Sequence, residues 1–246
     1  MIKLSVNLNK VATIRNSRGG SAPSVLEATR VCVEAGAPGV TVHPRADGRH
    51  ITESDVREVA ALLRDLGSRT EYNIEGDPRP DLMSLAIGLR PTQCTLVPVR
   101  PGEITSQAGW PADTPRAAIA SVISDLRRAG IRVSVFVEAE EAPIRWARDV
   151  GADRIELYTE PYARAFERGA TTADASFRNY VAAAELAHTL GMGVNAGHDL
   201  DLSNLELFRS LPHLDEVSIG HALISHALFV GLDRSVREYL SVLRAV

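Results

Sequence analysis

The sequence predicts an α/β protein folded as a single (β/α)8 barrel, the TIM-barrel class, with extra helices. Short β-branched runs alternate along the whole chain with longer stretches of helical periodicity. Eight such strand–helix cycles fit into 246 residues, which is the size and rhythm of this fold. No linker-like stretch interrupts the cycles, so we expect residues 1–246 to form one domain.

The rival fold is an open, doubly wound sheet. Such a sheet often carries a G-x-G-x-x-G turn between a strand and a helix. Gly191, Gly193 and Gly197 have the wrong spacing for that fingerprint, so we favour the barrel.

Each expected strand is a short run dominated by β-branched and apolar residues, such as KLSVNL, RVSVFVE and RIELYT. The eight strands are expected at residues 3–8, 39–43, 71–75, 93–98, 132–138, 154–159, 193–196 and 216–219.

The expected helices lie between these strands. Thr52, with Asp55 three residues later, is close to a capping box, and Gly130, Gly151 and Gly191 are helix-end signals. The helices are expected at residues 24–35, 52–66, 81–89, 114–129, 142–150, 175–190 and 202–211, and from residue 223 onward. The long connections, residues 99–113 and 160–174, are expected to act as lids or substrate walls.

Composition limits the classes of partner. The formal net charge of -4 gives no global basic surface for nucleic acid. Cys32 and Cys94 fall within apolar patterns and indicate buried thiols rather than a disulfide or a zinc site. The start of the chain turns polar too soon for a signal peptide, and no apolar run is long enough to span a membrane. We therefore expect a soluble cytoplasmic protein with no nucleic-acid or membrane partner.

The stretch VTVHPRADGRHI is the first candidate site. A β-branched strand breaks at Pro44, and the break presents His43, Arg45, Arg49 and His50. Histidine moves protons near neutral pH, and arginine matches phosphate and carboxylate oxygens. A polar surface loop could look the same, but other strands of this chain end in a similar way.

In a barrel, the chemistry lies at the C-terminal ends of the strands. Glu75 and Glu156 lie in or at the end of apolar strands, where an unpaired carboxylate is unfavourable, so we interpret them as functional. Glu138 opens the acidic run EAEE and is interpreted as a solvated helix start. The other candidates near strand ends are Asn7, Asn9, His43, Arg45, Thr105, His198 and His221.

The turns NAGHDL and SIGH, after the seventh and eighth strands, are the candidate phosphate sites. Barrels often bind phosphate there, with backbone N–H groups and a helix N-terminus. The opening segment of the chain adds Arg15, Arg18 and the glycine pair Gly19–Gly20 as further candidates for binding phosphate. The sequence therefore predicts phosphorylated small-molecule substrates, with a second phosphate near Arg45 and His50.

Two other enzyme classes use the same residue types. A metal-dependent sugar-phosphate epimerase or isomerase could bind its ion through the histidines with Glu75 and Glu156, but the rim lacks close ligand spacing such as H-x-H. A Schiff-base aldolase needs a lysine on the rim, where only Lys10 is available. A catalytically silent sugar-phosphate sensor is the alternative that is not an enzyme.

Seven motifs in register resemble the pyridoxine 5'-phosphate synthase (PdxJ) family. They are VNLNKVATIRNSRGG, TVHPRADGRHI, the strand with Glu75, LVPVRPGEITSQAGW, RIELYTEPYA, VNAGHDL and SIGHALI. The resemblance implies a (β/α)8 barrel with extra helices, assembled as a homo-octamer. It also implies condensation of 3-amino-2-oxopropyl phosphate with 1-deoxy-D-xylulose 5-phosphate, without a metal or an organic cofactor.

The resemblance also implies residue roles. His43 and Glu75 match general bases, His198 a general acid, and Glu156 a carboxylate that stabilises the transition state. The matches to the aminoketone-phosphate site are Asn7, Arg18, Gly220 and His221; those to the deoxyxylulose-phosphate site are Arg45, His50 and Thr105. The joint presence of His43, Glu75 and His198 argues against the sensor.

Three positions depart from a common pattern of the family. The chain has Asn9-Lys10 where many members have Asp-His, and Asp199 where many have glycine. We assign all three to substrate binding and expect Lys10 Nζ within about 4 Å of an Asp199 oxygen, directly or through a substrate or water. The alternative is that Asp199 caps the helix expected near Leu202.

Overall fold

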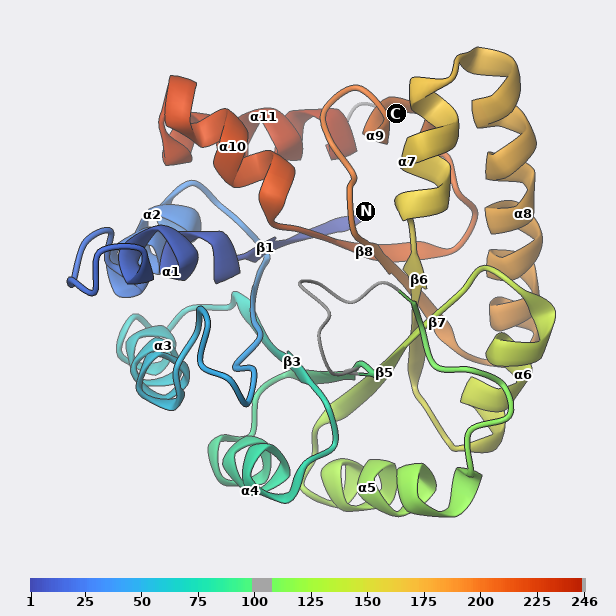
Figure 1. Cartoon of the computed structure of the whole chain (residues 1–246), viewed down its shortest axis with the longest axis horizontal. Helices are drawn as coiled ribbons and strands as arrows, with labels where there is room; N and C mark the ends of the chain where they lie inside the picture. Colours follow the sequence, from blue (N-terminus) through green and yellow to red (C-terminus); the bar gives the residue numbers. More distant parts are fainter. Residues whose placement is uncertain (99–107, 245–246) are drawn as a thin grey trace.

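Eight parallel strands close into a barrel in chain order in a computed structural model, which describes residues 1–98 and 108–244 (Figure 1). The strands are β1 (Lys3–Asn7), β2 (Gly39–Val42), β3 (Glu71–Gly76), β4 (Gln93–Leu96), β5 (Arg132–Val137), β6 (Arg154–Tyr158), β7 (Gly193–Gly197) and β8 (Leu214–Ile219). β1 pairs with β8 through Lys3 opposite Glu216, which closes the sheet. The predicted TIM barrel is therefore confirmed.

Helices surround the barrel on its outside (Figure 1). They are α1 (Asn9–Asn16), α2 (Val25–Glu34), α3 (Glu53–Asp65), α4 (Pro80–Leu89), α5 (Arg116–Arg128), α6 (Glu141–Asp149), α7 (Glu160–Glu167), α8 (Ala170–Thr189), α9 (Leu205–Phe208), α10 (His221–Val230) and α11 (Leu232–Arg244). The predicted capping box at Thr52 is present at the start of α3. None of the helices within the described ranges is long and apolar enough to cross a membrane.

The connection at residues 160–174 is not the loop that the sequence suggested. Most of it is helical, in α7 and the start of α8. Tyr162 and Ala165 are buried on α7, and Arg164 pairs with Glu160 one turn earlier, so packing and an i,i+4 pair favour the helix. α1 was likewise not expected as a helix. The other long connection lies largely outside the described residues.

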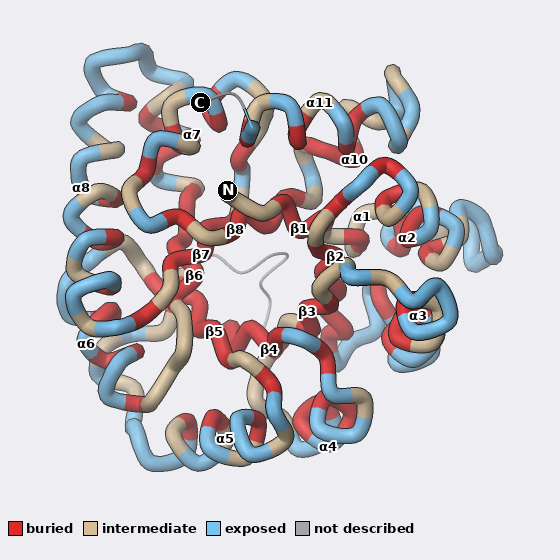
Figure 2. The backbone as a smooth tube through the Cα atoms, turned by 180° about the vertical axis from the view of Figure 1, so that it is seen from behind, coloured by how far each residue is buried: buried red, intermediate tan, exposed pale blue. Residues whose placement is uncertain are grey.

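The interior of the barrel is polar. Successive strand residues face opposite sides of the sheet. One set packs under the helices and is apolar, for example Val40, Ile74 and Val135. The alternate set includes the buried aromatic residues Phe136 and Tyr158 but is mostly polar, with Ser5, Thr41, Asn73, Gln93, Thr95, Ser134, Glu156, Asn195, Glu216 and Ser218. Figure 2 shows the buried strands at the centre of the molecule.

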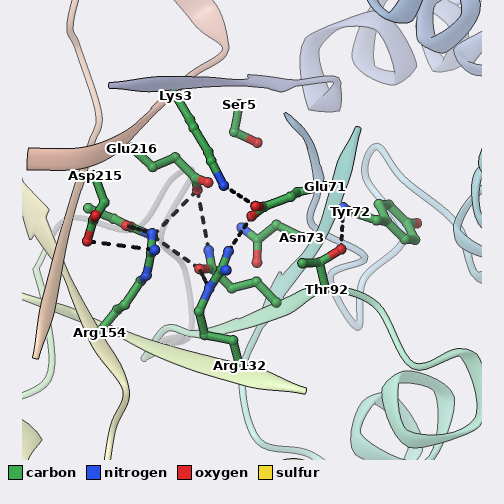
Figure 3. A network of polar contacts seen from close by, with 12 residues as sticks. Lys3, Ser5, Glu71, Tyr72, Asn73, Thr92, Arg132, Arg154, Asp215 and Glu216 are labelled. Carbon is green, nitrogen blue, oxygen red and sulfur yellow. Dashed lines mark hydrogen bonds and ion pairs between the residues drawn. The ribbon is translucent and has the colours of Figure 1, made fainter. Parts of the chain in front are cut away.

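An ion-pair network lies at the N-terminal end of the strands (Figure 3). Glu71 is paired with Lys3 and Arg132, and its pKa is lowered, because these cations outweigh the opposing effect of burial. Across the barrel, Gln93 on β4 donates to Glu216 on β8 at 3.4 Å. The network ties opposite strands together and leaves the other end of the barrel for chemistry.

Candidate active site

His43 and Glu75 form an acid–base pair at the C-terminal ends of β2 and β3. His43 Nδ1 lies 3.3 Å from Glu75 Oε1, and the two side chains are 5% and 15% exposed. Burial acts to raise the pKa of Glu75, but His43 and the more distant His198 and His50 lower it below its usual value. Glu75 is therefore an ionised carboxylate beside an imidazole, which is an arrangement suited to proton transfer.

The backbone of His43 is held by the end of β1 and the start of α1. Asn9 Oδ1 accepts the His43 N–H at 2.9 Å, and Asn7 Oδ1 accepts the Asn9 N–H at 3.0 Å. Gly220 fits closely against Asn7, because a Cβ there would lie 3.1 Å from the Asn7 Cβ. His43 Nε2 is buried and has no hydrogen-bond partner in the described part of the chain, so it is available to a substrate.

His50 is a neutral donor next to this pair. Its ring centroid lies 5.9 Å from that of His43. Its Nδ1 accepts the Ile51 N–H at 2.9 Å, so the proton of the neutral ring sits on Nε2. Burial, together with nearby His43, lowers the pKa of His50 to about 4. His50 is thus suited to donate a hydrogen bond to a substrate oxygen rather than to carry a charge.

Arg15 holds the loop that carries His50. Its guanidinium donates to Asp55 at 2.5 and 2.9 Å and to the His50 carbonyl at 3.2 Å. Asn16 donates to the same carbonyl at 2.8 Å. Arg15 was expected near a phosphate; its guanidinium instead makes these contacts, which connect α1, the His50 loop and α3.

Arg45 lines a cavity beside this loop. Its side chain is 5% exposed, and its Nε lies 3.9 Å from Asp47 Oδ2. The cavity of about 240 Å³ is also lined by Arg79, which donates to the Pro44 carbonyl at 2.5 Å. Sequence reasoning missed Arg79, because it lies four residues beyond Glu75 in a turn with no recognisable motif.

Glu156 lies in the polar interior of the barrel. Burial raises the pKa of Glu156 well above its usual value, and the charges of Glu75 and Glu216 add to this effect. Its hydrogen-bond partner is Thr95, and the Thr95 hydroxyl donates to Asn73 Oδ1 at 3.1 Å. The hydrogen bond with Thr95 acts in the opposite direction and lowers the pKa of Glu156, but burial outweighs it, so the neutral carboxylic acid is favoured.

Gly197 provides the room for Glu156. A Cβ on Gly197 would lie 2.6 Å from Glu156 Oε1, so a larger residue would displace the carboxyl group. Glu156 Oε2 is buried without a hydrogen-bond partner among the described residues. The carboxyl group is therefore well placed to meet a ligand that enters the barrel mouth.

His198 follows Gly197 and pairs with its own neighbour. His198 Nδ1 lies 2.9 Å from Asp199 Oδ2. No direct ion pair joins Lys10 to Asp199 in the described residues, and the charge of Lys10 acts on His50 instead. A link between the two through a substrate or water stays a prediction. The expectation that Asp199 caps a helix is wrong, because Asp201 accepts the N–H groups of Ser203 and Asn204.

The remaining expected site residues occupy different environments. Gly220 is the N-cap of α10 and His221 is its exposed first residue. Arg18 is exposed just beyond α1, and no contact joins it to His43 or Glu75 in the described structure. Thr105 lies outside the described residues. Glu138, interpreted as a solvated helix start, accepts the Gly109 N–H at 3.1 Å.

Within residues 1–98 and 108–244, no group of three or more His, Cys, Asp or Glu side chains could hold a metal ion. The side chains that converge are His43, His50, Glu75, Glu156 and His198, and they offer proton donors and acceptors. Fold and site together define a TIM-barrel enzyme that is equipped for general acid–base chemistry.

Comparison with known proteins identifies the family. The model of the family described as pyridoxal phosphate biosynthesis protein PdxJ matches residues 4–245. The pyridoxine 5'-phosphate synthase of Bacteroides fragilis (strain YCH46) is 51% identical over 245 residues, covering 99% of this chain and 100% of that protein. The pyridoxine 5'-phosphate synthase of Leptospira biflexa (strain Patoc 1 / Ames) is 48% identical, covering 99% and 97%. The chain belongs to the PdxJ family.

Solved structures show the same fold at low sequence identity. 3-Hexulose-6-phosphate synthase from Salmonella typhimurium has a TM-score of 0.65 at 14% identity, with 98% of each chain covered. Thiamine phosphate pyrophosphorylase from Pyrococcus furiosus has a TM-score of 0.60 at 13% identity, covering 98% of this chain and 95% of that one. These structural similarities support the assignment of the TIM-barrel fold, and the family match supports the activity.

Proposed function

We propose that this enzyme is a pyridoxine 5'-phosphate synthase of vitamin B6 biosynthesis. It condenses 3-amino-2-oxopropyl phosphate with 1-deoxy-D-xylulose 5-phosphate and releases pyridoxine 5'-phosphate, inorganic phosphate and water. The full-length match to relatives of that name supports the reaction. The observation that carries the proposal in the structure is the buried pair of His43 and Glu75 at the barrel mouth.

The chemistry needs successive proton transfers. The amine of one substrate attacks the carbonyl of the other to form an imine, and dehydration and ring closure follow. Glu75, ionised beside His43, accepts protons, and His43 relays them through its unpartnered Nε2. The imine joins the two substrates, so no enzyme lysine is required for it.

Two further groups complete the acid–base set. His198 donates protons to leaving oxygens as a general acid. Glu156, as a neutral carboxylic acid, donates a hydrogen bond to negative charge that develops on a substrate oxygen. This arrangement is consistent with the transition-state role that the family resemblance implies for Glu156.

The two substrate phosphates bind on different sides of the mouth. The aminoketone phosphate is assigned to Asn7, Arg18, Gly220 and His221, where α10 begins with free N–H groups. The deoxyxylulose phosphate is assigned to Arg45, His50 and Thr105. Asn9 contacts the His43 backbone and the charge of Lys10 acts on His50, and both residues are assigned to substrate oxygens.

The enzyme acts as a homo-octamer in the cytoplasm and needs no metal or organic cofactor, as the family resemblance implies. Size-exclusion chromatography with light scattering tests the assembly.

Complementation tests the function in cells. Expression of the chain in a bacterium that lacks its own pyridoxine 5'-phosphate synthase should restore growth without added pyridoxine. A Glu75→Gln variant expressed at the same level should not. Lack of rescue by the wild-type chain, when it is present as folded protein, would contradict the proposal.

A further inference from the structure

The turn after β7 has an unusual backbone. His198 has φ 88° and Asp199 has φ 57°, so two adjacent residues with side chains adopt the left-handed conformation that favours glycine. The other non-glycine residues with positive φ in the described ranges, Arg90 and His213, stand alone. Such strain persists only where surrounding contacts impose it, and it gathers at functional sites.

The contacts that impose this conformation converge on the His198 ring. The Asp199 carboxylate contacts Nδ1 at 2.9 Å. The ring packs edge-on against Tyr158, with centroids 5.0 Å apart and planes at 79°. The buried Thr159 hydroxyl contacts the carbonyls of both Gly197, at 2.8 Å, and His198. Ring and backbone are therefore both restrained.

The charges around the pair keep Asp199 ionised. The hydrogen bond from His198 lowers the pKa of Asp199, burial opposes this, and Arg164 on α7 and His221 on α10 add to the lowering. On the opposite side, the charge of Glu75 interacts with His198 across the mouth. An ionised Asp199 accepts a hydrogen bond only, so His198 Nδ1 must carry a proton.

We infer that Asp199 is a positioning residue for His198. Its carboxylate keeps the proton on Nδ1 and fixes the ring orientation, so that Nε2 is the atom that exchanges protons with the substrate. A carboxylate that orients a catalytic imidazole through its other nitrogen is a recurrent device. The inference rests on the proposed role of His198 as general acid, and it replaces substrate binding as the role of Asp199.

Three substitutions test the inference, with Asp201→Asn as the matched control. Asp199→Gly removes the carboxylate and suits the left-handed backbone, so the fold should be as stable as wild type or more so. Asp199→Asn tolerates the same backbone and loses only the charge. We expect kcat to fall roughly 10- to 100-fold in both, with KM within about 2-fold. Asp199→Glu should recover part of kcat, and Asp201→Asn should resemble wild type.

Nitrogen NMR of histidine-labelled protein reads the tautomer without any substrate. The His198 signals are assigned by their absence in His198→Gln. In the wild type Nδ1 should be protonated, and in Asp199→Gly the proton of the neutral ring should move to Nε2. The inference is overturned if Nδ1 of the wild type is unprotonated, if the tautomer is the same in Asp199→Gly, or if the variants raise KM alone. If the wild type makes no product, the proposed function fails, while the NMR result still decides the role of Asp199.

Discussion

The side-chain oxygen of Asn9 accepts the backbone N–H of His43 at 2.9 Å. This bond joins the first residue of α1 to the residue after β2, where the His43–Glu75 pair begins. An amide oxygen makes the bond without adding a negative charge next to Glu75. The departure from the common family pattern at Asn9 therefore preserves the support of His43.

Replacing Asn9 tests that support. Asn9→Ala leaves the buried His43 N–H without an acceptor, which destabilises a protein by about 1–3 kcal/mol. We expect the melting temperature to fall by several degrees and kcat to fall about 10-fold as His43 loses its position. Asn9→Asp keeps the acceptor and should restore most of the stability. A wild-type melting temperature and kcat in Asn9→Ala would show that the bond does not hold His43.

Glu75 is predicted to move protons rather than to bind substrate. Glu75→Gln keeps the shape of the side chain and removes its basicity. We expect kcat to fall by about 10²-fold or more while KM for both substrates stays nearly unchanged. Steady-state kinetics with each substrate varied in turn measure both quantities. An unchanged kcat would remove Glu75 from the mechanism.

Arg15 is predicted to act through His50. Arg15→Gln weakens the bonds to Asp55 and to the His50 carbonyl, which are charge-assisted contacts of about 1.5–3 kcal/mol. We expect KM for the deoxyxylulose phosphate to rise roughly 10-fold, with a smaller effect on KM for the aminoketone phosphate. Arg57→Gln is the control, since Arg57 makes an exposed pair with Glu53 on α3 and should have no effect. Equal rises in both KM values would contradict a local role at His50.

The partly buried His50 makes stability depend on pH. Its pKa is lowered from 6.5 to about 4, so between these values the unfolded chain binds a proton that the folded chain does not. The contribution of His50 to the free energy of unfolding is fully present above pH 6.5 and is lost as the pH falls toward 4. Urea unfolding measures the free energy of unfolding at pH 7 and at pH 5. Between these pH values, it should fall by about 2 kcal/mol more in the wild type than in His50→Gln. Equal losses in the two proteins would mean that His50 stays accessible to protons.

The fold was predictable because its signals are local and repeated. The β-branched runs, the helical stretches between them and the glycines after helices need no knowledge of distant contacts. The apolar strands also marked Glu75 and Glu156, since a carboxylate in such a strand stands out. α7 was missed because its buried Tyr162 and its Glu160–Arg164 pair lie in a stretch that also resembled a loop.

The partners of individual side chains were not predictable. Asp55 is 40 residues from Arg15, and nothing local distinguishes that pair from a phosphate-binding arginine. Asp199 was expected to pair with Lys10, because charge balance alone cannot show that backbone conformation turns its carboxylate toward His198. Such pairings depend on φ angles and on the register between strands, which periodicity does not encode.

Following both products of one reaction measures the proposed activity in a single assay. Purified protein, first dialysed against EDTA, is mixed with 3-amino-2-oxopropyl phosphate and 1-deoxy-D-xylulose 5-phosphate, and pyridoxine 5'-phosphate and inorganic phosphate are measured over time. We expect both products to appear in equal amounts, only when both substrates are present, and at the same rate with or without chelation. Turnover that is lost with EDTA and restored by Mn²⁺ or Zn²⁺, or an altered sugar phosphate without phosphate release, would contradict it and favour a metal-dependent epimerase or isomerase.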